Sequence, residues 1–134
     1  MQRTLVYLSG ACRNMHVEVS TFWRKYARNL FSNDVSIEVF NPCDHFMYGE
    51  HDPGNSKLIM DYFLQMIKKS DVVLVNLNFT EKSVGTGMEI QKAVDEGKIV
   101  IGFGNTEVYD YIKDCCSAVF KDVDSAVDFI ITHY

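Results

Sequence analysis

Residues 83–90 (SVGTGMEI) combine a serine, two glycines and a glutamate at the start of a segment with helical period. Gly85 and Gly87 at such a loop-to-helix junction expose backbone N–H groups at the positive end of the helix dipole, which attracts anions. Ser83 adds a hydroxyl to the same corner. Glu89 falls about one turn later, where its carboxylate can point back toward the strand ends. The alternative interpretation is a tight turn whose acid only complements the helix dipole.

A second candidate region is the loop that follows the first apolar run. Arg13 comes three residues after Gly10, and the planar guanidinium of arginine can bind two phosphate oxygens at once. Tyr7 lies in the apolar run itself, and its phenol can reach the same region. Spacing alone leaves two simpler alternatives open, namely a solvated surface arginine and a core tyrosine with a satisfied hydroxyl.

The residues disfavour several common cofactor and metal sites. No G-x-G-x-x-G follows the first run, no Walker lysine is present, and no serine lies in a nucleophile elbow, so no cofactor is expected. The four cysteines show no C-x-x-C spacing, which predicts reduced thiols in a cytoplasmic setting. Cys43, His45 and His51 lack an evident fourth zinc ligand, so we favour an ordinary loop over a metal site.

Length and charge limit the class of protein. A chain of 134 residues with 47% hydrophobic residues fits a single domain over residues 1–134. The net charge of −5 argues against a polynucleotide partner, which needs a basic surface, but leaves a small anionic ligand open. No apolar run approaches the roughly 20 residues of a membrane span, and the amino-terminal run does not resemble a signal peptide, so no membrane partner is expected.

The elements that must position these residues alternate between strand and helix. Short apolar runs predict strands at residues 5–9, 35–40, 71–76, 98–103 and 118–120. Helical segments are predicted at residues 17–31, from about residue 55 onward, and at 85–96, 106–114 and 122–133. This alternation predicts an α/β fold: a single doubly wound, Rossmann-like or flavodoxin-like, five-stranded parallel sheet with helices on both faces.

Helical spacing also predicts which side chains face the core. In the first helix the expected stripe is Phe22, Tyr26 and Leu30, and in the second it is Leu58, Phe63, Met66 and Ile67. Ligands of open parallel sheets bind beyond the carboxyl ends of the strands. That rule selects residues 9–14, 41–42, 76–87 and 102–106 as the candidate site.

Taken together, these segments resemble the nucleoside 2-deoxyribosyltransferase superfamily, including its 2′-deoxynucleoside 5′-monophosphate N-glycosidase branch. The resemblance runs nearly end to end. It rests on LVYLSG (5–10), FWR (22–24), VFNP (39–42), SDVVLVN (70–76), SVGTGMEI (83–90) and EGKIVI (96–101). It implies cleavage of the N-glycosidic bond of a nucleotide, by hydrolysis or by transfer to a second base.

The resemblance also implies catalytic roles. Glu89 fits the family's nucleophile, which attacks the anomeric carbon and forms a glycosyl-enzyme ester, and Tyr7 can hold its carboxylate. The family's acid usually lies eight residues before the aspartate of the third strand, but that position holds Phe63. Asp61, two residues further back, becomes the candidate acid. A catalytically weak relative that binds a nucleotide as a sensor or sequestering protein is the alternative.

Substrate and partners follow from the same resemblance. Gly10, Arg13 and Ser83 match the branch that binds a 5′-monophosphate, whereas Asn14 stands where that branch has glycine. The other expected substrate-binding residues are Asn41, Gly85, Gly87 and Tyr109. Family members complete the pocket with residues from a neighbouring subunit, so a homodimer or higher homo-oligomer is expected, with the segment around Tyr109 as the donor.

Overall fold

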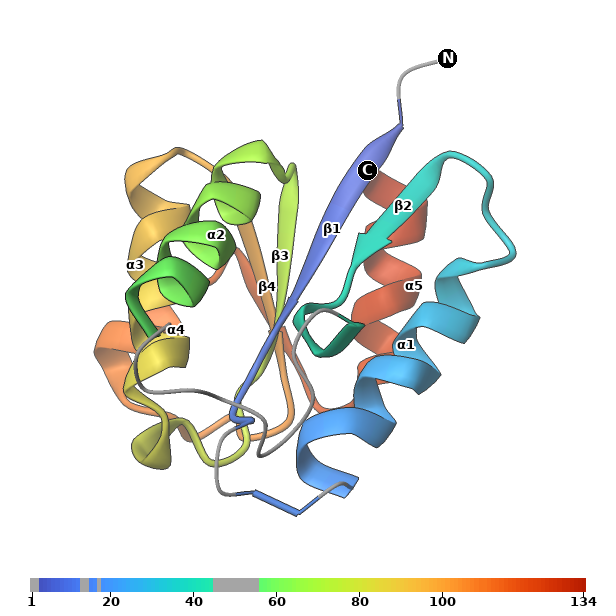
Figure 1. Cartoon of the computed structure of the whole chain (residues 1–134). Coiled ribbons are helices and arrows are strands. Elements are labelled where there is room, and N and C mark those ends of the chain that lie inside the picture. Colours follow the sequence, from blue (N-terminus) through green and yellow to red (C-terminus); the bar gives the residue numbers. More distant parts are fainter. Residues whose placement is uncertain (1–2, 13–14, 17, 45–55) are drawn as a thin grey trace.

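The computed structural model describes residues 3–12, 15–16, 18–44 and 56–134, shown in Figure 1. The strands are β1 (Thr4–Ser9), β2 (Ile37–Phe40), β3 (Val72–Asn76), β4 (Ile99–Phe103) and β5 (Ala118–Phe120). The α-helices are α1 (Trp23–Phe31), α2 (Ser56–Lys69), α3 (Val84–Asp95), α4 (Asp110–Cys115) and α5 (Val123–His133). A π-helical turn (Glu18–Phe22) precedes α1, and 3-10 turns occupy Pro42–Asp44 and Thr80–Lys82.

The five strands form one parallel sheet in the order β2-β1-β3-β4-β5. Helices α1 and α5 cover one face, and α2, α3 and α4 cover the other (Figure 1). The predicted doubly wound architecture is therefore confirmed. The strand order reverses direction between β1 and β3, and ligands of such sheets bind outside the carboxyl ends at this switch point.

Two predicted elements begin later than expected, because Asx turns occupy their first residues. Before β2, the Asp34 carboxylate accepts the N–H of Ser36 at 2.9 Å, so the strand starts at Ile37. Before α4, the Asn105 side chain accepts the N–H of Glu107 at 3.0 Å, and the helix starts only at Asp110. In both cases the side chain competes with regular backbone pairing.

The predicted inward stripe of the first helix is wrong by one residue. Phe22 and Tyr26 are 51% and 46% exposed, and Leu30 is only partly buried. Trp23, Ala27 and Phe31 pack against the sheet instead. Both stripes are apolar with the same spacing, so periodicity cannot choose between them, and the Tyr26 hydroxyl finds its partner in Asp124 of α5.

The second helix shows a similar shift at its first turn. Leu58 is 72% exposed, and Ile59 is buried in its place. Ile59, Phe63 and Ile67 are spaced four residues apart and form the inward stripe, with Met66 partly buried beside it. The prediction holds for three of its four residues and fails for Leu58.

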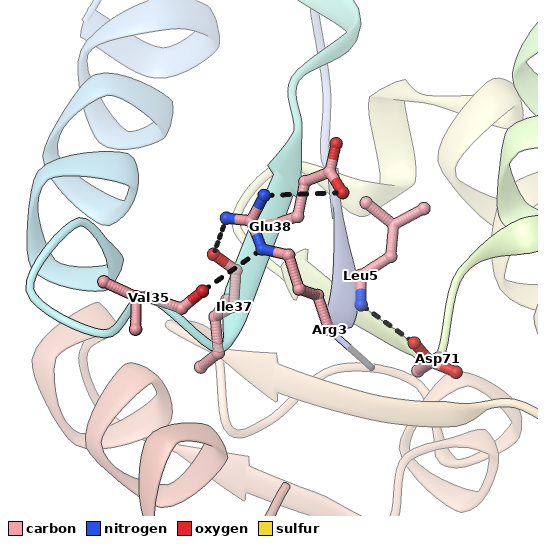
Figure 2. Close-up of polar contacts among 6 residues, drawn as sticks. All are labelled: Arg3, Leu5, Val35, Ile37, Glu38 and Asp71. Carbon is pink, nitrogen blue, oxygen red and sulfur yellow. Dashed lines mark hydrogen bonds and ion pairs between the residues drawn. The ribbon is translucent and has the colours of Figure 1, made fainter. Parts of the chain in front are cut away.

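Polar contacts join the amino ends of three strands, at the end of the sheet opposite the switch point (Figure 2). The N–H of Leu5 donates to the Asp71 carboxylate at 2.8 Å, which links β1 to the start of β3. The Arg3 guanidinium donates to the carbonyls of Ile37 at 3.0 Å and Val35 at 3.2 Å. In the part of the chain described, no helix has the length and apolar content needed to span a membrane.

Candidate active site

Strand β1 and helix α3 bring three polar side chains together at the switch point. Tyr7 and Ser9 are two residues apart on β1, so their side chains point to the same face of the sheet. The Tyr7 hydroxyl donates to Glu89 Oε2, and the Ser9 hydroxyl donates to Glu89 Oε1 at 2.7 Å. Each carboxylate oxygen of Glu89 therefore receives one hydroxyl, and the group is fixed in orientation.

Burial sets the electrostatics of this group. Glu89 as a whole residue is partly exposed, but protein atoms surround its carboxyl group. This desolvation raises the pKa of Glu89, and the hydrogen bonds from Tyr7 and Ser9 and the charge of Arg24 partly oppose the rise. Burial and the nearby carboxylate raise the pKa of Tyr7 well above its usual value. Tyr7 therefore stays protonated and donates its hydrogen bond over the whole physiological range.

Aromatic rings cover the β2 side of Tyr7. The Phe40 ring stacks on Tyr7 with a centroid distance of 5.3 Å and an interplanar angle of 20°. Phe63 of α2 meets Phe40 edge-on at 6.3 Å, and Tyr62 lies 6.0 Å from Phe40. Phe63 is the residue at the position where the resemblance would place the acid, so an apolar ring stands there instead of a carboxylate.

Asp61, the candidate acid, lies on α2 with more than half of its side chain exposed. Lys57, one turn earlier on the same helix, forms an ion pair with it at 2.8 Å. Such exposed pairs between residues four apart contribute only about 0.3 kcal/mol to helix stability. Among the described residues, Asp61 forms no hydrogen bond with Glu89 or Tyr7.

The residues predicted to bind an anion lie at the start of α3, but some of their polar groups already form hydrogen bonds within the helix. The Ser83 hydroxyl caps the helix by accepting the N–H of Thr86 at 3.2 Å, and it lies 2.7 Å from the Thr86 hydroxyl. The N–H of Gly87 donates to the Ser83 carbonyl at 3.4 Å. Gly85 is in the first turn, where N–H groups lack intrahelical acceptors. Of the two glycines, only Gly85 has an N–H without a hydrogen-bond partner among the residues that the structure describes.

Gly10 directly follows β1 and lies against Asn76, the last residue of β3, at the switch point. A Cβ on this residue would lie 3.1 Å from Asn76 Cβ and 3.2 Å from the Trp23 ring. Only glycine lets the loop pass this close to the end of β3 without displacing a neighbour. Arg13 and Asn14, the other predicted residues of this loop, lie outside the described residues, as do His45 and His51.

Two further predicted binding residues serve other contacts in this chain. Asn41 is buried, and its side-chain oxygen accepts the N–H of Cys43 at 2.9 Å, which builds the turn after β2. Tyr109 is 71% exposed. It lines a separate pocket of about 260 Å³ together with Thr80, Glu81, Asn105, Glu107 and Val108. That pocket does not include Glu89.

Sequence reasoning missed two residues of this site. The predicted strand ends at Ser9, and its spacing of two residues from Tyr7 is the signal that identifies it as a second hydrogen-bond donor to Glu89. Arg24 is 2% exposed and donates to the carbonyls of Ser20 and Gly10, the latter at 3.0 Å. Nothing in its spacing separated it from a surface arginine.

Two thiols lie beside this group. Cys12 Sγ and Cys43 Sγ are 3.8 Å apart, and both cysteines are free. The hydrogen bond from Cys12, aided by the charge of Arg24, lowers the pKa of Cys43 to about 6, although burial opposes the change. In the portion of the chain that is described, no three His, Cys, Asp or Glu side chains gather as a metal site.

A family model described as nucleoside 2-deoxyribosyltransferase matches residues 6–126 of this chain. Among solved structures, a 2-deoxyribosyltransferase of Bacillus psychrosaccharolyticus aligns with a TM-score of 0.75 and 18% identity, covering 98% of this chain and 92% of that one. A conserved protein of Enterococcus faecalis V583 gives 0.75 and 14%, covering 98% and 99%. The CMP N-glycosidase BcmB of Clostridium botulinum gives 0.60 and 19%, covering 98% and 100%. No curated protein matches the chain, and at these identities the structures show a common fold.

Proposed function

Since the chain belongs to the nucleoside 2-deoxyribosyltransferase family, we propose that it cleaves the N-glycosidic bond of a (deoxy)nucleoside 5′-monophosphate through a covalent glycosyl-Glu89 intermediate. The family acts on the glycosidic bond of nucleosides or nucleotides. The observation that carries the finer proposal is the Glu89 carboxylate, which receives one hydroxyl on each oxygen at the switch point of the sheet.

In this mechanism a Glu89 oxygen attacks the anomeric carbon as the bond to the base nitrogen breaks. The electron pair of that bond leaves with the base, which takes up a proton. Water then hydrolyses the ester, or a second base displaces it, and the carboxylate is regenerated. A carboxylate nucleophile divides one difficult displacement into two easier ones and stabilises the oxocarbenium-like charge of the transition state.

Tyr7 and Ser9 support this role by holding the nucleophile in one rotamer. Their hydrogen bonds also favour the ionised form of Glu89 against the effect of burial. Reaction requires that form, because a protonated carboxyl group has no free electron pair of sufficient basicity to attack. The stacked Phe40 ring keeps the Tyr7 side chain in place.

The proposal of a 5′-monophosphate rests on groups near the switch point that can bind an anion. Gly10 lies in the loop after β1, the N–H of Gly85 lies at the start of α3, and the resemblance adds Arg13.

We also propose a homo-oligomer in which Tyr109 of a second copy completes the pocket. The exposure of Tyr109 in a single chain supports this arrangement.

A second candidate function is nucleotide binding with little or no turnover. It is favoured by one specific observation, namely that Phe63 occupies the expected acid position while Asp61 pairs with Lys57 in solvent. Without a positioned acid, departure of the base loses a factor of roughly 10²–10⁴ in rate.

Chromatography after incubation with a panel of nucleosides and 5′-monophosphates, with and without an acceptor base, separates the two. Free base that appears only with protein supports the enzyme, whereas nucleotide binding without release of base supports the sensor. In the same panel, kcat/KM for the monophosphate should exceed that for the matched nucleoside by at least about tenfold, because a charge-assisted hydrogen bond contributes about 1.5–3 kcal/mol. The variant Arg13→Ala should lose most of this difference. Equal values in the wild type would exclude the phosphate assignment.

A further inference from the structure

Arg24 is a buried cation without a carboxylate partner. Its side chain is 2% exposed, and among the described residues no acid forms an ion pair with it. The guanidinium donates to two backbone carbonyls and lies 4.9 Å from the Trp23 ring centroid, while its Nε has no hydrogen-bond partner in the described structure. Burying a charge this way costs folding free energy. A purely structural role would be served better by an apolar side chain.

The contacts of Arg24 connect it to the proposed nucleophile through the backbone. Its Nη2 donates to the carbonyl of Gly10 at 3.0 Å. Gly10 is bonded to Ser9, whose hydroxyl donates to Glu89 Oε1 at 2.7 Å. Gly10 is also held between Asn76 and the Trp23 ring, where a Cβ would be too close to both. The guanidinium therefore fixes the turn that follows β1, directly after Ser9, which donates to Glu89.

The second contact fixes Arg24 itself. The guanidinium reaches the Ser20 carbonyl from its Nη1. Ser20 belongs to the π-helical turn Glu18–Phe22 that leads into α1. The Arg24 side chain thus links the turn before α1 to the residue that follows β1, near the switch point.

We propose that Arg24 is a positioning residue for the reaction: it holds the Gly10 carbonyl so that Ser9 meets Glu89, and its buried positive charge, without an ion pair, favours the ionised form of the nearby carboxylate. This inference rests on the proposed role of Glu89 as the nucleophile. Arg24 touches no reacting atom in this account and acts through Gly10 and through its electric field.

The electrostatics of the neighbouring groups agree with that role. The charge of Arg24 lowers the pKa of Glu89 and of the Cys43 thiol, and it opposes the rise in the pKa of Tyr7. Among the described residues, the titratable groups that act on Glu89 are Tyr7 from β1 and Arg24 from α1, and Cys12 feels the Glu89 charge in turn. Arg24 is the only cation in this set.

Two substitutions separate the hold on Gly10 from the charge. Arg24→Lys keeps the charge but loses the fork that spans two carbonyls, and Arg24→Met loses both. Lys25→Met is the matched control, because it removes a charge from the next, exposed position of α1. The measurements are kcat and KM, the pH profile of kcat/KM, and the pKa of Glu89 in the free protein from its side-chain carboxyl ¹³C signal.

For Arg24→Met we expect kcat to fall at least about tenfold with little change in KM, since misplacement of a reacting group by about 1 Å can cost a hundredfold in rate. We also expect the pKa of Glu89 and the acidic limb of the profile to move to higher pH. Arg24→Lys should keep the wild-type pKa and lose part of kcat, and Lys25→Met should match the wild type.

An unchanged Glu89 pKa in folded Arg24→Met, or wild-type kcat in Arg24→Lys, would overturn the proposal. If Arg24→Met does not fold, Arg24→Lys decides through its kcat. The pKa is measured without substrate, so it tests Arg24 even if no turnover exists. Turnover that survives in Glu89→Gln would instead remove the proposed function.

Discussion

The Tyr7 hydroxyl of the first strand donates to Glu89 Oε2, 82 residues later in the chain. Tyr7 is fully buried, and its ring stacks on Phe40, so the donor has little freedom to leave the carboxylate. A short strand and the first turns of a distant helix are thereby joined at the carboxyl end of the sheet, where the chain leaves the neighbouring strands β1 and β3 for helices on opposite faces.

The variant Tyr7→Phe should impair the reaction while leaving the fold intact. Loss of the hydroxyl removes a hydrogen bond to a charged group, about 1.5–3 kcal/mol, and we expect kcat to fall roughly tenfold to a hundredfold. The pKa of Glu89 should rise further, so the acidic limb of the pH-rate profile should move to higher pH. Tyr26→Phe is the control, because its hydroxyl bonds Asp124 on the opposite face. A shift of the same size in both variants would contradict the assignment.

The variant Glu89→Gln should be more stable than the wild type at neutral pH. Because burial raises the pKa of Glu89 in the folded state, its contribution to stability is fully present below the unfolded pKa, about 4.3, and is lost as the pH rises through the folded value. The amide carries no charge to desolvate. Urea unfolding between about pH 4 and pH 7 should therefore show a stability advantage of the variant that grows with pH. An advantage that shrinks with pH would contradict the desolvation of Glu89.

Asp61→Asn tests the candidate acid, and Lys57→Gln is its control. Both substitutions break the same exposed ion pair, so both should change the free energy of unfolding by only about 0.3 kcal/mol. If Asp61 protonates the leaving base, only Asp61→Asn lowers the rate, by roughly 10²–10⁴. Steady-state rates of the two variants decide the matter. Equal rates would remove Asp61 from the mechanism.

The sequence was sufficient to predict the sheet, because strand signals are local. Residues 72–75 are continuously apolar, and they form the central strand β3, which is buried on both faces. The last predicted helix starts at residue 122, and the Asp122 carboxylate caps α5 by accepting the N–H of Ser125 at 2.8 Å. The third predicted helix, residues 85–96, stops just before Gly97, and the φ of +69° at Gly97 shows why glycine is needed there.

Features that depend on packing between distant segments were not predictable in the same way. The choice between the Tyr26 and Ala27 stripes of α1 depends on how closely the helix approaches the sheet. The burial of Arg24 depends on the π-helical turn before α1 and on the path of Gly10. The resemblance pairs Tyr7 with Glu89, but only the fold shows that Ser9 donates to the same carboxylate.

The central claim is that Glu89 forms a covalent bond to the sugar, and mass spectrometry of the acid-quenched protein during turnover tests it most directly. The account predicts a mass increase equal to the glycosyl phosphate, located by fragmentation to Glu89, and absent from Glu89→Gln under the same conditions. Turnover without any adduct, an adduct on another residue, or a Glu89→Gln variant that keeps more than about a tenth of the wild-type rate would contradict it.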